Sequence, residues 1–148
     1  MLHFGNTPVP YTVSWSGEDH LFLDHCPHAG GRLAICQEVR PGEGKPKFGA
    51  PHMNRQREVI SKGLCDLCGK SLKNRTKVSL SHARSRTHAN EPLDVLQVEP
   101  LLHRECALIS AQHCPSLRRD IRNGTLEIRQ VTRWQVQLAV YSEQGVFE

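Results

Sequence analysis

The segment GLCDLCGKSL at residues 63–72 decides the fold, because it places two cysteines, Cys65 and Cys68, in one short turn. Zinc prefers four nitrogen or sulfur ligands in a tetrahedron, and two ligands separated by two residues reach one ion when the backbone turns tightly between them. Gly69 follows the second cysteine directly and gives the turn the conformational freedom that it requires. The pattern predicts a zinc knuckle.

A second pair of candidate ligands, His103 and Cys106, lies at the start of a predicted helix, where the backbone dipoles favour a thiolate. The 34 residues between the two pairs hold a predicted β-hairpin. We therefore predict one Zn²⁺ ion held by Cys65, Cys68, His103 and Cys106. Because four protein ligands leave no position open for water, this zinc should be structural and not catalytic. The alternative is a set of buried or redox-active thiols.

The six cysteines and nine histidines of this 148-residue chain could also suggest a disulfide scaffold. However, the opening sequence MLHFGNTPVP has neither the basic nor the apolar region of a secretion signal, and no run of 18 apolar residues occurs. We therefore expect a soluble, intracellular protein in the cytoplasm, with no membrane partner and with thiols that remain available to a metal.

The apolar content of 38% supports only a modest core, which a bound metal would reinforce. We expect an α+β fold, in which a small zinc-stabilised treble clef of knuckle, β-hairpin and helix is flanked by short antiparallel strands. Three parts are predicted: a β-rich segment at 1–48, the zinc module with its preceding helix at 49–122, and a C-terminal β-hairpin packed on the same core at 123–148.

The expected secondary structure has two helices among short strands. One helix should run over 52–62 and end at Gly63, and the other should run over 103–113 and end before Pro115. The segment at 40–51 holds three prolines and three glycines and is predicted to be a loop. The predicted strands are 9–15, 20–24, 32–39, 76–81 paired with 95–98, and 126–131 paired with 134–140.

The first predicted helix has an apolar and a basic face. Met53, Gln56, Val59 and Ile60 are expected on its inner face. The basic side chains Arg55, Arg57 and Lys62 are expected to lie outside.

The net charge of +4 is distributed unevenly along the chain. Residues 1–51 carry four basic and five acidic side chains and 91–148 carry six and eight, whereas 52–90 carry nine and two, a net charge of +7. Such a band attracts phosphate backbones or an acidic protein surface, and salt weakens either contact. A solvated face without a partner is the alternative.

The residues predicted to contact nucleic acid are Arg55, Arg57, Lys70, Lys73, Arg75, Lys77, Arg84 and Arg86. Aromatic residues make up only 5% of the chain, and none lies between Phe48 and Trp134. Contact with a duplex backbone is therefore expected in preference to stacking on single strands.

A second metal site is conceivable around Cys26, where the sequence HCPH adds His25 and His28, with Cys36 ten residues further on. No closely spaced partner follows Cys36, which lies in a strand pattern where a buried thiol is ordinary. We therefore favour buried thiols. Cys114 is interpreted as a packed helix residue and not as a ligand.

The pattern CDLCG at 65–69, a strand ending in SLSH at 79–82, and EPLLHREC at 99–106 resembles the HNH endonucleases, which are a treble-clef family. The resemblance implies that His82 is a candidate general base, and Asn90 is a candidate for the family's middle asparagine. Ser81 and Ala107 stand where the family has a metal-binding residue and a last histidine. Because phosphodiester cleavage needs a cation as well as a base, the resemblance implies a non-catalytic relative.

Over about 49–119, the order FGAPHMNRQR, CDLCG, HRECA and HCPSLRR is similar to a group of small zinc proteins of bacteria and their phages, which carries no known activity. By analogy, that resemblance makes roles in defence or counter-defence plausible.

Three functions remain open from the sequence. We favour a non-catalytic, zinc-stabilised module that binds nucleic acid through its basic surface. The first alternative is a protein-binding adaptor or phage-type inhibitor of a host or defence complex, for example a CRISPR complex. The second is an HNH-like metal-dependent nuclease with ligands from outside the motif, such as His88 or His113. No small-molecule substrate is indicated.

Overall fold

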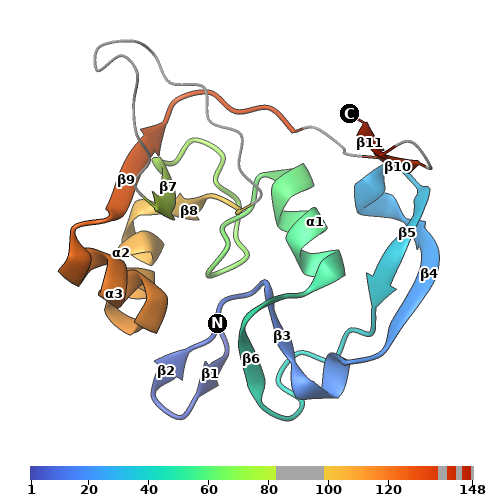
Figure 1. The fold of residues 1–148 in the computed structure, drawn as a ribbon, viewed down its shortest axis with the longest axis horizontal. Helices are drawn as coiled ribbons and strands as arrows, with labels where there is room; N and C mark the ends of the chain where they lie inside the picture. The colour runs from blue at the N-terminus through green and yellow to red at the C-terminus, as the bar shows by residue number, and fades with distance from the viewer. Residues whose placement is uncertain (83–98, 137–139, 143–144, 148) are drawn as a thin grey trace.

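The computed structural model describes residues 1–82, 99–136, 140–142 and 145–147, and combines helices with small antiparallel sheets (Figure 1). The helices in these ranges are α1 (Met53–Lys62), α2 (Arg104–His113) and α3 (Pro115–Asn123). The α+β class expected from the sequence is confirmed. The strand predicted at 95–98, which would complete a treble-clef hairpin, lies outside the described residues.

The first third of the chain forms antiparallel ribbons. The predicted strands at 20–24 and 32–39 are confirmed with shifted ends, as β4 (Leu21–Cys26) and β5 (Arg32–Gln37), which pair with each other. The 3-10 helix η2 (Pro27–Ala29) lies in the connection between them. Of the strand predicted at 9–15, only β3 (Val13–Trp15) is regular, and a second 3-10 helix, η1 (Ser16–Glu18), follows it directly.

A short ribbon at the N-terminus was not predicted. It consists of β1 (His3–Phe4) and β2 (Thr7–Pro8), which are joined by a tight turn.

The loop predicted at 40–51 is wrong in its second half. β6 (Pro46–Pro51) pairs with β3, and it crosses the predicted boundary after residue 48. Its two prolines lie at the ends of the strand, where a missing N–H group disturbs pairing least. The β3–β6 register shifts between its ends, so the ribbon is irregular.

Helix α1 begins and ends as the sequence predicts. His52 is its N-cap and accepts a hydrogen bond at Nδ1 from the amide of Arg55, at 3.2 Å. Gly63 is its C-cap, with a φ of 65° that favours glycine, and its amide donates to the carbonyl of Val59. Val59 is buried on the inner face.

The predicted outward position of Arg55 is wrong. Its side chain is 5% exposed and forms two hydrogen bonds to the fully buried carboxylate of Glu18. Its guanidinium also donates to the carbonyl groups of Tyr11 and Val13. The physical reason is that a charge can be buried when an opposite charge and carbonyl acceptors satisfy its donors.

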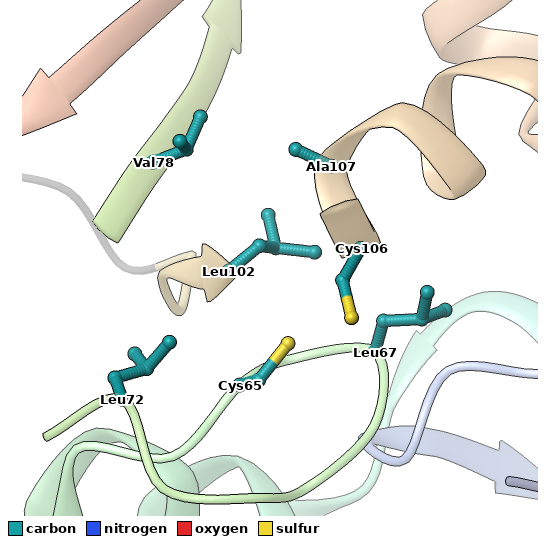
Figure 2. Packing of buried hydrophobic residues seen from close by; sticks show 7 residues of the cluster. All are labelled: Cys65, Leu67, Leu72, Val78, Leu102, Cys106 and Ala107. Atoms are coloured by element: carbon teal, nitrogen blue, oxygen red, sulfur yellow. The ribbon is translucent and has the colours of Figure 1, made fainter. Parts of the chain in front are cut away.

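One side of the molecule holds a three-stranded antiparallel sheet that packs against α2 (Figure 1). β7 (Lys77–His82) lies between β8 (Leu102–His103) and β9 (Leu126–Val131). The main buried cluster lies where this sheet, α2 and the knuckle meet (Figure 2). Its members are Cys65, Leu67, Leu72, Val78, Leu102, Cys106 and Ala107.

The predicted C-terminal hairpin of 126–131 with 134–140 is wrong. β9 pairs along its whole length with β7, from Lys77 opposite Val131 to His82 opposite Leu126. Instead, β10 (Val140–Ser142) pairs with β11 (Gly145–Phe147). Helix α3 was not predicted. A proline can either end one helix or occupy the first turn of the next, and Pro115 was interpreted only as the end of the helix before it, whereas it begins α3.

Candidate metal centre

The four predicted zinc ligands come together. One ligand atom from each of Cys65, Cys68, His103 and Cys106 lies within 4.8 Å of every other. Two of these residues belong to the knuckle, His103 ends β8, and Cys106 lies in the first turn of α2. Figure 2 shows the sulfur atoms of Cys65 and Cys106 turned toward each other from the knuckle and from α2. A three-cysteine, one-histidine set of this size fits one zinc ion.

The knuckle is a tight turn closed by backbone hydrogen bonds. The amide of Cys65 donates to the carbonyl of Lys70, and the amide of Gly69 donates back to the carbonyl of Cys65, both at 2.8 Å. Gly69 has a φ of 72°, which L side chains rarely adopt. These bonds turn both knuckle cysteines toward one point.

The hydrogen bonds of His103 fix which ring nitrogen faces the thiols. Its Nε2 lies 2.9 Å from the carbonyl oxygen of Ser71, and because a carbonyl only accepts, Nε2 carries the proton. Nδ1 therefore presents its lone pair, 3.4 Å from the sulfur of Cys68 and 3.9 Å from that of Cys106. This is the arrangement in which a metal-binding histidine is oriented by a backbone carbonyl.

The thiols need a cation in order to ionise together. Burial, followed by the nearby Cys65 and Cys68, raises the pKa of Cys106 to about 12. Burial also raises the pKa of Cys65. At neutral pH these two groups stay protonated unless a cation displaces their protons, so metal binding should release protons.

The knuckle is also held from outside. The amide of Tyr11 donates to the carbonyl of Leu67, and the amide of Asp66 donates to the carbonyl of Leu101, both at 2.9 Å. The hydroxyl of Thr12 donates to the carboxylate of Asp66. The site therefore joins three separate stretches of chain, those before β3, after α1 and before α2.

The structure does not bring the other candidate ligands into a metal site. Cys26 and Cys36 are buried with Ala29 in a small cluster of their own. Within the ranges that the structure describes, the set around Cys65 is the only group of metal-binding side chains close enough to hold an ion. Cys114 lies between α2 and α3, half-buried, outside this group.

The residues predicted to contact nucleic acid divide into three groups. Lys70, Lys73 and Arg75 are exposed and Lys77 is half-buried, all on the segment from the knuckle to β7. Arg55 and Arg57 do not belong with them, as Arg55 is buried and Arg57 is half-buried beside Cys36. Burial raises the pKa of that thiol, and the charge of Arg57 partly offsets the rise. Arg84 and Arg86 lie outside the described residues.

The residues tied to the nuclease resemblance are only partly described. Ser81 accepts a hydrogen bond at Oγ from Arg129, at 2.8 Å, and Ala107 is buried in the main cluster. His82 is the last residue of β7, and His113 is the exposed last residue of α2. His88, Asn90 and the side chain of His82 lie outside the described residues, so the role of His82 stays a prediction.

Sequence reasoning missed a cavity beside the knuckle. Its volume is about 410 Å³, and it is lined by Lys62, Gly63, Ser71, Lys73, Asn74, Lys77 and Trp134. From its alternating apolar pattern, Trp134 was predicted to begin a strand, and no cavity was predicted. The only signal in the sequence was that Lys62 belongs to the basic band, and nothing local places a tryptophan there from 72 residues further along.

None of the helices in the described part of the chain has the length and apolar character needed to cross a membrane. Comparison of the chain with protein families, with characterised proteins and with solved structures gives no match, so its function is argued from the site.

Proposed function

We propose that this chain is a non-catalytic module, stabilised by one structural Zn²⁺ ion, that binds nucleic acid through a basic surface. We define the basic surface by Lys62, Lys70, Lys73, Arg75 and Lys77. The observation that carries the proposal is that four of these five lie on the stretch that follows the knuckle directly, whose backbone is fixed to the metal centre.

Zinc contributes by holding this stretch in one conformation. The amide of Leu72 donates to the carbonyl of Gly63, and the carbonyl of Ser71 accepts from His103, so the chain is anchored just before Lys73. Four protein ligands complete a tetrahedral coordination shell and leave no place for an activated water. The metal then supports a binding surface and supplies no chemistry.

In the part of the chain that the structure describes, acidic side chains do little to offset the charges of the basic surface. The ion pair of Arg75 with Glu105 has an N–O distance of 3.6 Å and both side chains are more than half exposed, so it holds the arginine weakly. Among the described residues that line the cavity, none is acidic. A phosphate backbone supplies the missing negative charge, and its release of counterions makes binding depend on salt.

The test measures binding of the zinc-loaded protein to a DNA duplex over a range of salt concentrations. The triple variant K73Q/R75Q/K77Q should bind more weakly, and its salt slope should fall by about 0.9 for each phosphate that is no longer neutralised. The matched control is R118Q/R119Q/R122Q, which removes three charges from α3. Equal weakening in both variants would show unspecific charge attraction, and no binding at low salt would overturn the proposal.

The absence of catalysis is tested separately. Wild type and H82A are incubated with supercoiled plasmid and Mg²⁺ or Mn²⁺, and we expect no nicking by either protein. Metal-dependent nicking by wild type that H82A abolishes would establish the nuclease instead.

A second candidate function, a protein-binding adaptor or inhibitor, is favoured by an apolar face on the β4–β5 ribbon. Leu23 lies opposite Ile35 with 67% and 50% of their surfaces exposed, and Leu33 beside them is 62% exposed. Cys26 and Cys36 lie buried on the other face. Exposed apolar surfaces of this kind often bind proteins.

This second function predicts capture of a protein partner from cell extract that survives nuclease treatment and is abolished in the variant L23S/I35S. A partner that is released by nuclease, or that L23S/I35S still binds, would contradict it.

A further inference from the structure

The cavity beside the knuckle combines positive charge with an aromatic ring. Its three lysines come from three different elements: Lys62 ends α1, Lys73 lies in the turn after the knuckle, and Lys77 begins β7. Its volume of about 410 Å³ lies within the range of about 300–1,000 Å³ that is usual for small-molecule sites. The cavity is therefore large enough for a group bigger than a simple anion.

Trp134 lies at the rim of this cavity with its ring edge against Gly63. A Cβ atom added to Gly63 would lie 2.9 Å from Cζ2 of the indole and 3.1 Å from Cη2, closer than side chains tolerate. The chain after β9 passes over the C-terminal end of α1, where Gly63 lies (Figure 1). The absence of a side chain at Gly63 thus lets the ring edge rest on the helix end, while 42% of the tryptophan surface stays exposed.

The opposite wall is built on the metal centre. Ser71 lines the cavity, and its carbonyl accepts the hydrogen bond from His103. Asn74 has a φ of 58°, a left-handed conformation that asparagine tolerates better than most residues, and it turns the chain between Lys73 and Lys77. The side chain of Lys77 donates to the carbonyl of Arg75 at 3.3 Å, which holds it along this turn.

From these contacts we infer that the cavity binds one nucleotide of a single-stranded nucleic acid, with the base stacked on Trp134 and the phosphates near Lys62, Lys73 and Lys77. The inference rests on the proposed function and makes it specific. An anion without a planar ring would leave the indole unused, whereas every base offers a π face that stacks on an aromatic side chain. A duplex keeps its bases paired and stacked, so only a single strand can use both features. The inference thus departs from the duplex contact that the scarcity of aromatic residues favours, because the fold brings Trp134 to the lysines from far along the chain.

The experiment measures fluorescence anisotropy of labelled oligo(dT) and oligo(U) of about 12 nucleotides, a length in the usual range for single-strand sites, and of a duplex of equal length. The proteins are zinc-loaded wild type, W134A, W134F and F48A. Phe48 is the matched control, since it is 53% exposed and lies on β6, outside the cavity lining. The DNA and RNA arms show which sugar the site accepts.

We expect W134A to lower affinity for a single strand by about tenfold or more, because stacking contributes strongly for each base. Its salt slope should not change, since the lysines that neutralise the phosphates are all retained. W134F should stay close to wild type, and so should F48A. W134A should bind the duplex as wild type does. Zinc content and the thermal midpoint of each variant show that its fold is intact.

Single-strand affinity that is the same in W134A and wild type overturns the inference while leaving the proposed function in place, provided that wild type binds the duplex. The inference is also overturned if wild type binds polyglutamate as tightly as it binds a single strand and W134A weakens that binding too. This result indicates an acidic protein partner. If wild type binds neither duplex nor single strand at low salt, the proposed function fails as well.

Discussion

The guanidinium of Arg55 and the carboxylate of Glu18 form a buried bidentate ion pair, with N–O distances of 2.6 and 2.7 Å. Glu18 also accepts from the backbone amides of Trp15 and Arg40, so its oxygens are well satisfied. The pair joins α1 to the stretch after β3. Because α1 leads directly into the knuckle, this pair connects the N-terminal ribbons to the candidate metal centre, in addition to the bonds that Tyr11 and Thr12 make to the knuckle.

Removing one partner of this pair should destabilise the protein strongly. R55M leaves the carboxylate of Glu18 buried without its cation and should lower the free energy of unfolding by about 3–5 kcal/mol, whereas R55M/E18L should recover much of that loss. Urea unfolding measures both, with R118A on α3 as an exposed control expected within about 0.5 kcal/mol of wild type. A double variant no more stable than R55M would argue against a buried pair.

Acid should destabilise the protein through Glu18. Burial by itself raises the pKa of this group, but hydrogen bonds from Arg55, Arg40 and Trp15 outweigh it, and the pKa lies below its ordinary 4.5. A lowered pKa means that the folded state binds fewer protons than the unfolded chain. Its contribution is therefore full above about 4.5 and disappears as the pH falls below that value. When the free energy of unfolding is measured at a series of pH values, R55M should lose less stability than wild type as the pH falls through this range.

His52 adds a second pH dependence, nearer to neutrality. Burial lowers its pKa from 6.5, although its hydrogen bond to the carbonyl of Glu38 opposes this. The neutral ring donates from Nε2 and caps α1 through Nδ1, and protonation removes the capping acceptor. Stability should fall as the pH drops below about 6.5.

The variant H52N isolates this contribution, because asparagine can still cap the helix but does not titrate. The gap in unfolding free energy between wild type and H52N should narrow between pH values of about 7.5 and 5. A constant gap would contradict a neutral, capping histidine.

Substituting two glycines by alanine distinguishes the cost of backbone strain, at Gly30, from that of strain together with a steric clash, at Gly69 in the knuckle. Gly30 and Gly69 have φ values of 66° and 72°, but a Cβ at Gly30 meets nothing within 4 Å, whereas one at Gly69 lies 2.9 Å from the ring of Tyr11. G30A should cost about 1–2 kcal/mol from conformation alone. Urea unfolding should show a clearly larger loss for G69A, and equal losses would mean that Tyr11 does not pack against the knuckle.

The structure also predicts that a second metal is not bound at the β4–β5 ribbon. The double variant C26A/C36A should keep the zinc content of wild type, since these thiols are buried in a cluster separate from the four ligands. Metal analysis of the purified variant checks this. A fall in zinc content at an unchanged thermal midpoint would show that the ribbon does hold a metal.

Local signals in the sequence were sufficient to predict the cluster of candidate metal ligands and α1. Two spaced pairs of soft ligands and a glycine at each critical turn, Gly63 and Gly69, define these parts without reference to distant residues. The same locality explains why α1 has the predicted ends and why the four candidate ligands lie close together.

The parts that sequence reasoning misplaced depend on distant partners. β9 pairs with β7, about 48 residues earlier, so its alternating pattern gave no hint of its partner. Arg55 is buried because Glu18 lies 37 residues before it, and composition alone places an arginine outside. β6 resembles a loop because two of its six residues are prolines and one is a glycine, and its strand structure depends on pairing with the distant β3.

The central claim is that one zinc ion, held by Cys65, Cys68, His103 and Cys106, organises the fold. The most direct measurement is the zinc content of the purified chain together with its circular dichroism before and after chelation, for wild type, C106S and C114S. Cys114 is the matched control because it is a cysteine eight residues further on that lies outside the cluster. We predict one zinc per chain in wild type and C114S, a cooperative loss of structure on chelation, and little zinc in C106S. Wild-type protein that is fully folded without zinc, or C106S that retains a full complement, would contradict the account.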